Sequence, residues 1–304
     1  MKAYIGTLLS ILVFCLSSCY GPRNIYSASP FVSPVRMEKR ATAIEANYFT
    51  HTGPTNARDT HLGNRDNCFG LTFSHMLKER TLVFASTDFK NERNQFHDST
   101  DIFNNSLYDT YNAYNAGFDS SIVFGKRYSF GAGIEFFSDD LGKVTSSLVV
   151  SVGFHQLNMK ESGLLLQAPY QRFYKVNQLS LSLQSNLLFK VSSRFNLAWV
   201  TSLSLLNTLK ANTDYSSGEM LNAGLRDRKI DIFFCATGIY ADYKPLRKIP
   251  IYITGQFFND LSLWKHSFAK YELGRTYVKG TGVSVGMKYI FKIGKNDKAS
   301  ISAK

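Results

Sequence analysis

The chain has 304 residues, of which 44% are hydrophobic and 14% aromatic, and it carries 35 Lys+Arg against 23 Asp+Glu, a net charge of +12. The basic residues form no cluster and no recognised nucleic-acid-binding motif, which excludes a nucleic-acid-binding function. Beyond the leader no apolar run reaches the roughly 18 residues of a transmembrane helix, and the four cysteines lack the spacing of a disulfide scaffold or a zinc site. The body of the chain is therefore either a soluble domain or a β-barrel.

The N-terminus has the layout of a secretory signal peptide, with Lys2, an apolar stretch and two serines. The sequence LSSC at 16–19 resembles the bacterial lipobox, in which Cys19 takes a diacylglyceryl group, the leader at 1–18 is removed, and the new N-terminus is acylated with a fatty acid such as palmitate. The alternative is an ordinary signal peptide cut near Gly21 or Ser27. Several acyl chains would hold the N-terminus on a bilayer, because each buried CH2 adds about 0.8 kcal/mol of membrane affinity.

Residues 20 to 41 contain three of the seven prolines and no hydrophobic periodicity. Such a composition predicts an extended segment rather than a helix or strand. Residues 19–41 are therefore expected to form a lipidated tether between the membrane and the following domain.

From residue 42 onward, apolar and polar residues alternate with the period of two that is typical of β-strands. The clearest runs begin at Val144, Leu179, Phe195 and Val283. The polar face carries mainly Ser, Thr, Gly, Asn and Gln, which suits a crowded lumen better than the water-facing side of a soluble sheet. The apolar face tends to finish in aromatic residues, as an interfacial girdle does. The pattern favours an all-β, transmembrane, antiparallel up-and-down β-barrel over residues 42–293, with a polar tail at 294–304.

The alternation predicts ten strands, with eight or twelve as alternatives. Five strands run in one direction, at 42–51, 81–90, 144–157, 194–208 and 249–259. The other five run in the opposite direction, at 67–77, 118–137, 172–190, 227–244 and 281–293. Short connections at 78–80, 138–143, 191–193 and 244–248 alternate with long polar loops at 52–66, 91–117, 158–171, 209–226 and 260–280. In outer-membrane barrels the short turns are periplasmic and the long loops extracellular. An extra turn at 126–129 is rejected, because Tyr128 and Phe130 continue one apolar face.

Ten strands enclose little space, so side chains are expected to fill the lumen. The long or charged residues expected there are Glu45, Glu135, Gln184, Lys190, Tyr252, Gln256 and Lys288. Their number argues against an open pore. Cys68 and Cys235 are expected to be small apolar or lumen-facing thiols that stay reduced, because their strands would lie four strands apart and beyond disulfide reach.

Taken together, these features resemble a family of small, largely uncharacterised outer-membrane β-barrel lipoproteins of Bacteroidetes-type bacteria. The resemblance is carried by LSSC, by NIYSASP at 24–30, by the ten-strand rhythm and by the last strand, VSVGMKYIFKI at 283–293. It implies a Gram-negative cell envelope, an outer-membrane location and a lipid on Cys19. Surface-exported lipoproteins of such bacteria usually have acidic residues after the cysteine. Here residues 20–23 are YGPR, which favours a lipid anchor in the periplasmic leaflet.

Candidate catalytic and metal sites are weak. His97, Asp98 and Asp101 could act as a general base with partners at the barrel rim, but no spaced signature accompanies them. His51 and His61 have no identifiable third metal ligand. The prediction is therefore a non-enzyme with no catalytic residue, no metal and no cofactor apart from the lipid on Cys19.

One long loop has a composition that suits ligand contact. Tyr108, Tyr111 and Tyr114 are three residues apart among several Asn and Asp residues, a mixture that can stack on a glycan or dock a partner protein. Turn formation and an interfacial aromatic belt explain the same residues without a ligand. The expected partners are outer-membrane lipid and an unidentified envelope protein or glycan.

Three functions remain after these exclusions. The first is a structural or interaction role through the extracellular loops or the periplasmic face. The second is a narrow diffusion pore for small solutes, and the third a rim hydrolase or protease.

Overall fold

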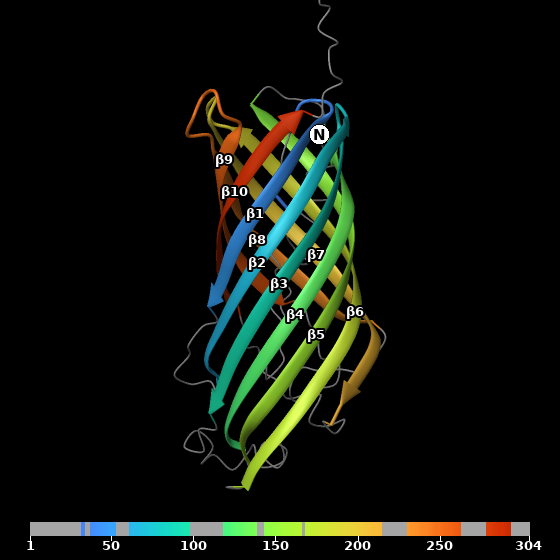
Figure 1. The fold of residues 1–304 in the computed structure, drawn as a ribbon, viewed down its shortest axis with the longest axis vertical. Helices are drawn as coiled ribbons and strands as arrows, with labels where there is room; N and C mark the ends of the chain where they lie inside the picture. Colours follow the sequence, from blue (N-terminus) through green and yellow to red (C-terminus); the bar gives the residue numbers. More distant parts are fainter. Residues whose placement is uncertain are drawn as a thin grey trace, which may run out of the picture.

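Ten antiparallel strands close into a single barrel in the computed structural model (Figure 1). The structure describes residues 32–33, 37–52, 61–97, 118–138, 143–165, 168–214, 230–262 and 278–292. The strands are β1 (Ala41–Thr52), β2 (His61–Lys78), β3 (Thr81–His97), β4 (Phe118–Phe137), β5 (Val144–Leu165), β6 (Ala168–Lys190), β7 (Phe195–Thr213), β8 (Ile230–Tyr243), β9 (Ile251–Ser262) and β10 (Val278–Lys292). Each strand pairs with its neighbours in the chain, and β1 also pairs with β10, so the sheet has no free edge.

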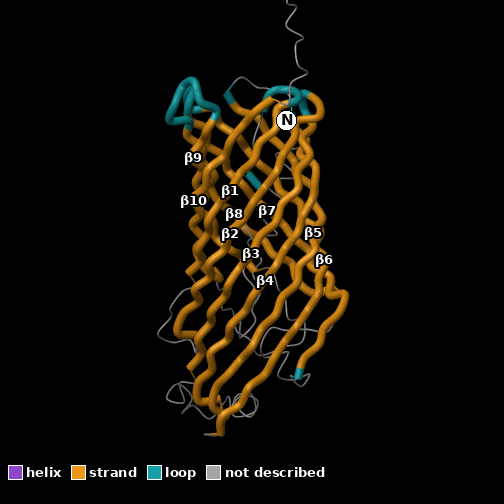
Figure 2. The backbone as a smooth tube through the Cα atoms, in the orientation of Figure 1, coloured by secondary structure: helices purple, strands orange, loops and turns teal. Residues whose placement is uncertain are grey.

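The predicted ten-stranded, up-and-down topology is confirmed. The short connections at 79–80, 191–194 and 244–250, and the residues Ser138 and Lys143 between β4 and β5, lie together at one end, which we call the short-turn end (Figure 2). β4 runs without interruption through 126–129, as expected from its continuous apolar face, so the chain makes no extra turn there.

The predicted loop at 158–171 is wrong. β5 and β6 continue through it as a paired hairpin, from Asn158 opposite Lys175 to Leu165 opposite Ala168. This hairpin extends beyond β1 at the end opposite the short turns (Figure 1). Met159 and Glu161 keep the inward-facing alternation and are almost fully buried, so the strand persists although its composition becomes more polar. The more polar composition of 158–171 predicted the end of a strand where β5 in fact continues.

The predicted division into two faces is confirmed. On the outside, Phe130, Val152 and Met287 are each about 60% exposed. Their inward-facing neighbours Ser129 and Lys288 are 3% and 1% exposed. An apolar sleeve around a polar interior is the reverse of a soluble protein, and it is stable where the sleeve contacts lipid.

The lumen is packed with side chains. Five of the predicted lumen residues are buried there: Glu45, Glu135, Gln184, Gln256 and Lys288. Tyr252 is only partly buried, and Lys190 is exposed as the last residue of β6. The prediction for Lys190 is therefore wrong, because the strand has reached solvent at the short-turn end.

Cys68 lies on β2 and Cys235 on β8, and these two strands are separated by β1, β10 and β9. Cys68 is a buried free thiol that faces the lumen, as predicted, and its Sγ donates to Asp88 Oδ1 at 3.9 Å. Among the described residues, none forms a helix of the length and apolarity needed to cross a membrane.

Candidate functional site

Two hydrogen-bonded clusters fill the lumen near the short-turn end. In the first, Lys288 Nζ donates to Asp242 Oδ2 and to Tyr240 Oη, both at 2.9 Å. Nearby, Glu45 Oε1 accepts from Thr254 Oγ1 at 3.0 Å. These groups come from β1, β8, β9 and β10, so the cluster ties together the strands on both sides of the closing β1–β10 seam.

The second cluster is centred on Glu135 of β4. Its Oε1 accepts from Ser147 Oγ at 2.6 Å and from Asn186 Nδ2 at 3.1 Å. Gln184 Nε2 donates to Asn186 Oδ1 at 2.9 Å and extends this cluster along β6. Buried carboxylates are stable only with such partners, so the cluster is a fixed part of the barrel.

A part of the predicted tether lies inside this lumen. Val32 N donates to Gln184 Oε1 at 3.1 Å, and Gln184 Nε2 donates to Val32 O at 2.7 Å. Ser33 Oγ donates to Glu45 Oε1 at 2.7 Å. The segment thus joins both clusters. The sequence carries no periodicity that would have placed these residues in the barrel.

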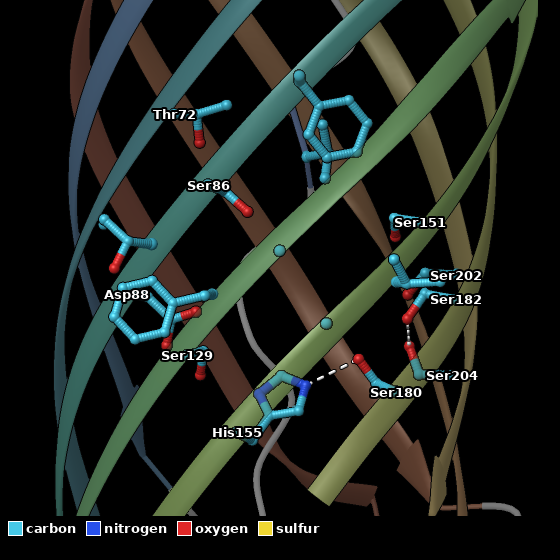
Figure 3. A pocket seen from close by; sticks show the side chains of 18 of the residues that line it. Thr72, Ser86, Asp88, Ser129, Ser151, His155, Ser180, Ser182, Ser202 and Ser204 are labelled. Atoms are coloured by element: carbon cyan, nitrogen blue, oxygen red, sulfur yellow. Dashed lines mark hydrogen bonds between the residues drawn. The ribbon is translucent and has the colours of Figure 1, made fainter.

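Val32 also borders a cavity of about 160 Å³ in the middle of the lumen, which we call the chamber. Hydroxyl groups dominate its walls (Figure 3). Its polar lining comprises Ser86, Ser129, Ser151, Ser180, Ser182, Ser202, Ser204, Thr72, Asn47, Gln178 and Gln184, together with Asp88, Arg127 and His155. The alternation of the strands explains this concentration, because each of the seven serines occupies an inward-facing position.

Small residues make room for the chamber's hydrogen bonds. His155 Nε2 hydrogen-bonds Ser180 Oγ at 2.8 Å, and the hydroxyls of Ser182 and Ser204 hydrogen-bond at 2.7 Å (Figure 3). A Cβ on Gly153 would lie 2.6 Å from Ser180 Oγ. Glycine at this position therefore allows the His155–Ser180 pair to form.

Some buried polar atoms beside the chamber have no hydrogen-bond partner among the described residues. These atoms are Asn47 Oδ1, Ser129 Oγ and His155 Nδ1. An unpaired buried polar atom is costly. Among the described residues, no carboxylate hydrogen-bonds His155 Nδ1, the position at which an acid orients the base of a serine hydrolase.

Aromatic and charged side chains fill the lumen on the far side of the chamber from the short-turn end. Phe49 lies two residues beyond Asn47 on β1, and its ring stacks on that of Phe258 with centroids 5.1 Å apart. Lys90 Nζ lies 5.5 Å from the centroid of Phe49 and 3.2 Å from Glu92 Oε1. Phe49, Phe258 and Lys90 are fully buried, so their side chains occupy the lumen at this level.

Most of the sequence-predicted site residues fall outside the part of the chain that the structure describes: Cys19, Asp98, Asp101, Tyr108, Tyr111 and Tyr114. The backbones of His51, His61 and His97 lie in β1, β2 and β3, and their side chains are likewise outside the description. Sequence reasoning missed the chamber residues Asp88, Arg127 and His155. Their inward-facing positions in the strand alternation could have identified them. Within the described residues, no group of three His, Cys, Asp or Glu side chains could hold a metal ion.

No protein-family model matches the chain. No curated protein matches it either. Among solved structures, the translocator domain of the autotransporter NalP from Neisseria meningitidis is 11% identical with a TM-score of 0.47, covering 82% of this chain and 87% of its own. The transport unit of the autotransporter AIDA-I from Escherichia coli is 10% identical with a TM-score of 0.47, covering 93% and 97%. The outer membrane protease OmpT from Escherichia coli is 8% identical with a TM-score of 0.39, covering 83% and 96%.

Proposed function

We propose that the chain is an outer-membrane β-barrel lipoprotein with a closed lumen, which acts through its extracellular loops or its periplasmic face and not by conducting solutes. The apolar outer face and the alternation of short and long connections support the location. The resemblance to small barrel lipoproteins of Bacteroidetes-type bacteria supports the lipid on Cys19. In this proposal the short-turn end faces the periplasm, and the anchor lies in the periplasmic leaflet.

The burial of large side chains in the lumen on both sides of the chamber carries this proposal. Glu135, Lys90 and Phe49 are 0% exposed, and Tyr240 and Lys288 are 1% exposed. The walls of a water-filled pore would leave such groups solvated. A ten-stranded barrel has little lumen to spare, and here side chains occupy it above and below the chamber.

A planar-bilayer measurement on the purified, full-length barrel tests the proposal. The expected result is no steady single-channel conductance in molar KCl. Reproducible ohmic steps at neutral pH would contradict the closed lumen and favour the narrow diffusion pore instead.

A hydrolase or protease is the other alternative. The proposal assigns no catalytic role to His155 or Ser180, since no acid orients the free ring nitrogen. Covalent labelling of Ser180 by a fluorophosphonate would contradict this and revive the enzyme alternative.

A further inference from the structure

We infer that Val32, Ser33 and Met37 form a removable plug, which closes the chamber on its short-turn side against small hydrogen-bonding solutes. This inference rests on the proposed closed lumen and identifies the part that closes it. Val32 is at once a wall of the chamber and the hydrogen-bonding partner of Gln184.

A tight turn places the plug inside the barrel. Ala41 N donates to Glu38 O, and Arg40 N donates to Met76 O, both at 2.9 Å. Arg40 has a φ of 65°, the left-handed conformation that non-glycine residues seldom adopt. The turn directs the chain into β1 on one side and leaves Met37 packed in the lumen on the other, in a buried cluster with Met76 and Leu82.

The plug is held differently from the wall. Every strand of the wall is paired with a neighbouring strand on each side, whereas Val32 and Ser33 belong to no strand. Two hydrogen bonds between Val32 and Gln184 and one from Ser33 to Glu45 hold them, and Val32 also packs against the cluster around Met37. Loss of the three hydrogen bonds would weaken the hold on these residues while the closed ladder of the barrel remained intact. The plug is therefore separable from the fold.

The chamber behind the plug has the chemistry of a solute site. Its walls include the hydroxyl-bearing residues Ser182 and Ser204, together with Asp88, Arg127 and His155, which can donate to or accept from a polar solute. The volume of about 160 Å³ equals about five water molecules at ~30 Å³ each. This volume suits water or a small polyol or amino acid.

Thiol labelling of the folded, full-length barrel in detergent tests the plug. The reporter is Ser151→Cys, which lines the chamber, in a background with Cys68→Ser and Cys235→Ser. The plug variant adds Ser33→Ala and Gln184→Leu, which together remove the three hydrogen bonds. The probes are a small methanethiosulfonate reagent and a bulky dye maleimide. The small reagent should react about 10-fold or more faster in the plug variant, the effect expected for the loss of three ordinary hydrogen bonds, and the maleimide should stay slow.

The matched control is Gln178→Leu, which changes another buried, chamber-lining glutamine of the same strand that has no bond to Val32. It should leave the labelling rate unchanged, and heat-modifiable gel mobility verifies that every variant is folded. If the plug variant and the control react equally, the plug inference is wrong while the closed lumen stands. Ser193→Cys, on an exposed short turn, gives the labelling rate of a fully accessible thiol. If the Ser151→Cys reporter with an unaltered plug is labelled at that rate, the closed lumen itself is wrong.

Discussion

Lys288 and Asp242 form an ion pair across the lumen, although β9 separates their strands in the wall. The Nζ–Oδ2 distance is 2.9 Å, and the two side chains are 1% and 6% exposed. Asp242 Oδ1 also accepts from Asn196 Nδ2 at 2.7 Å, so the carboxylate joins β7, β8 and β10. The pair connects strands that share no ladder.

Removal of this ammonium should destabilise the barrel strongly. Lys288→Met leaves Asp242 buried without its cation, and we expect a loss of about 3–5 kcal/mol in the free energy of unfolding, measured by urea titration in lipid vesicles. Adding Asp242→Asn should recover part of the loss. Lys292→Met, which breaks an exposed pair with Glu38, is the control and should change nothing measurable. Equal effects of both lysine substitutions would contradict the buried pair.

The two faces of β6 can be tested with adjacent residues. Leu181 is 51% exposed on the outer face, whereas Ser182 lines the chamber. Leu181→Arg places a charge against lipid and should cost about 2–4 kcal/mol of unfolding free energy in vesicles. Ser182→Arg should cost less, because the polar chamber can hydrate the charge, and Ser182→Gln controls for bulk. A larger loss for Ser182→Arg than for both other variants would mean that the faces are reversed.

A glycine in β10 makes room for the aromatic stack. A Cβ on Gly282 would lie 2.3 Å from Cζ of Phe258, whose ring stacks on Phe49. Gly282→Ala should therefore displace the ring and lower the unfolding free energy by about 1–3 kcal/mol, the cost of overpacking. Gly255→Ala is the matched control, because its nearest contact would be at 3.8 Å. Urea unfolding should separate the two variants, and no difference between them would show that the ring moves aside without cost.

The lipid anchor gives a prediction that is independent of the barrel. Cys19→Ala should abolish acylation and leave a barrel with unchanged heat-modifiable mobility, because no described strand contains residue 19. Mass spectrometry of the N-terminal peptide is the measurement. A wild-type peptide without lipid would refute the lipobox interpretation and support cleavage near Gly21 or Ser27.

The predictability of the fold follows from the geometry of a strand. Period-two alternation predicted ten strands and outward-facing residues such as Phe130 and Met287, because these properties depend on local side-chain direction. Glu45, Glu135 and Lys288 were placed in the lumen by the same rule. The alternation of short and long connections predicted the directions of the strands. The prediction failed at 158–171, where the composition becomes more polar although the chain continues as the β5–β6 hairpin.

Only the closed structure decided how the inward-facing residues meet. Lys288 and Asp242 lie 46 residues apart, and Gln184 lies 152 residues from Val32. These contacts depend on the stagger and tilt of the closed barrel, which alternation does not encode. The entry of Val32 and Ser33 into the lumen likewise follows from the turn at Arg40 and from hydrogen bonds to Glu45 of β1 and Gln184 of β6. The sequence alone determined which side of the wall each side chain occupies, and the tertiary structure decided which side chains share the space inside, because that depends on distances across the barrel.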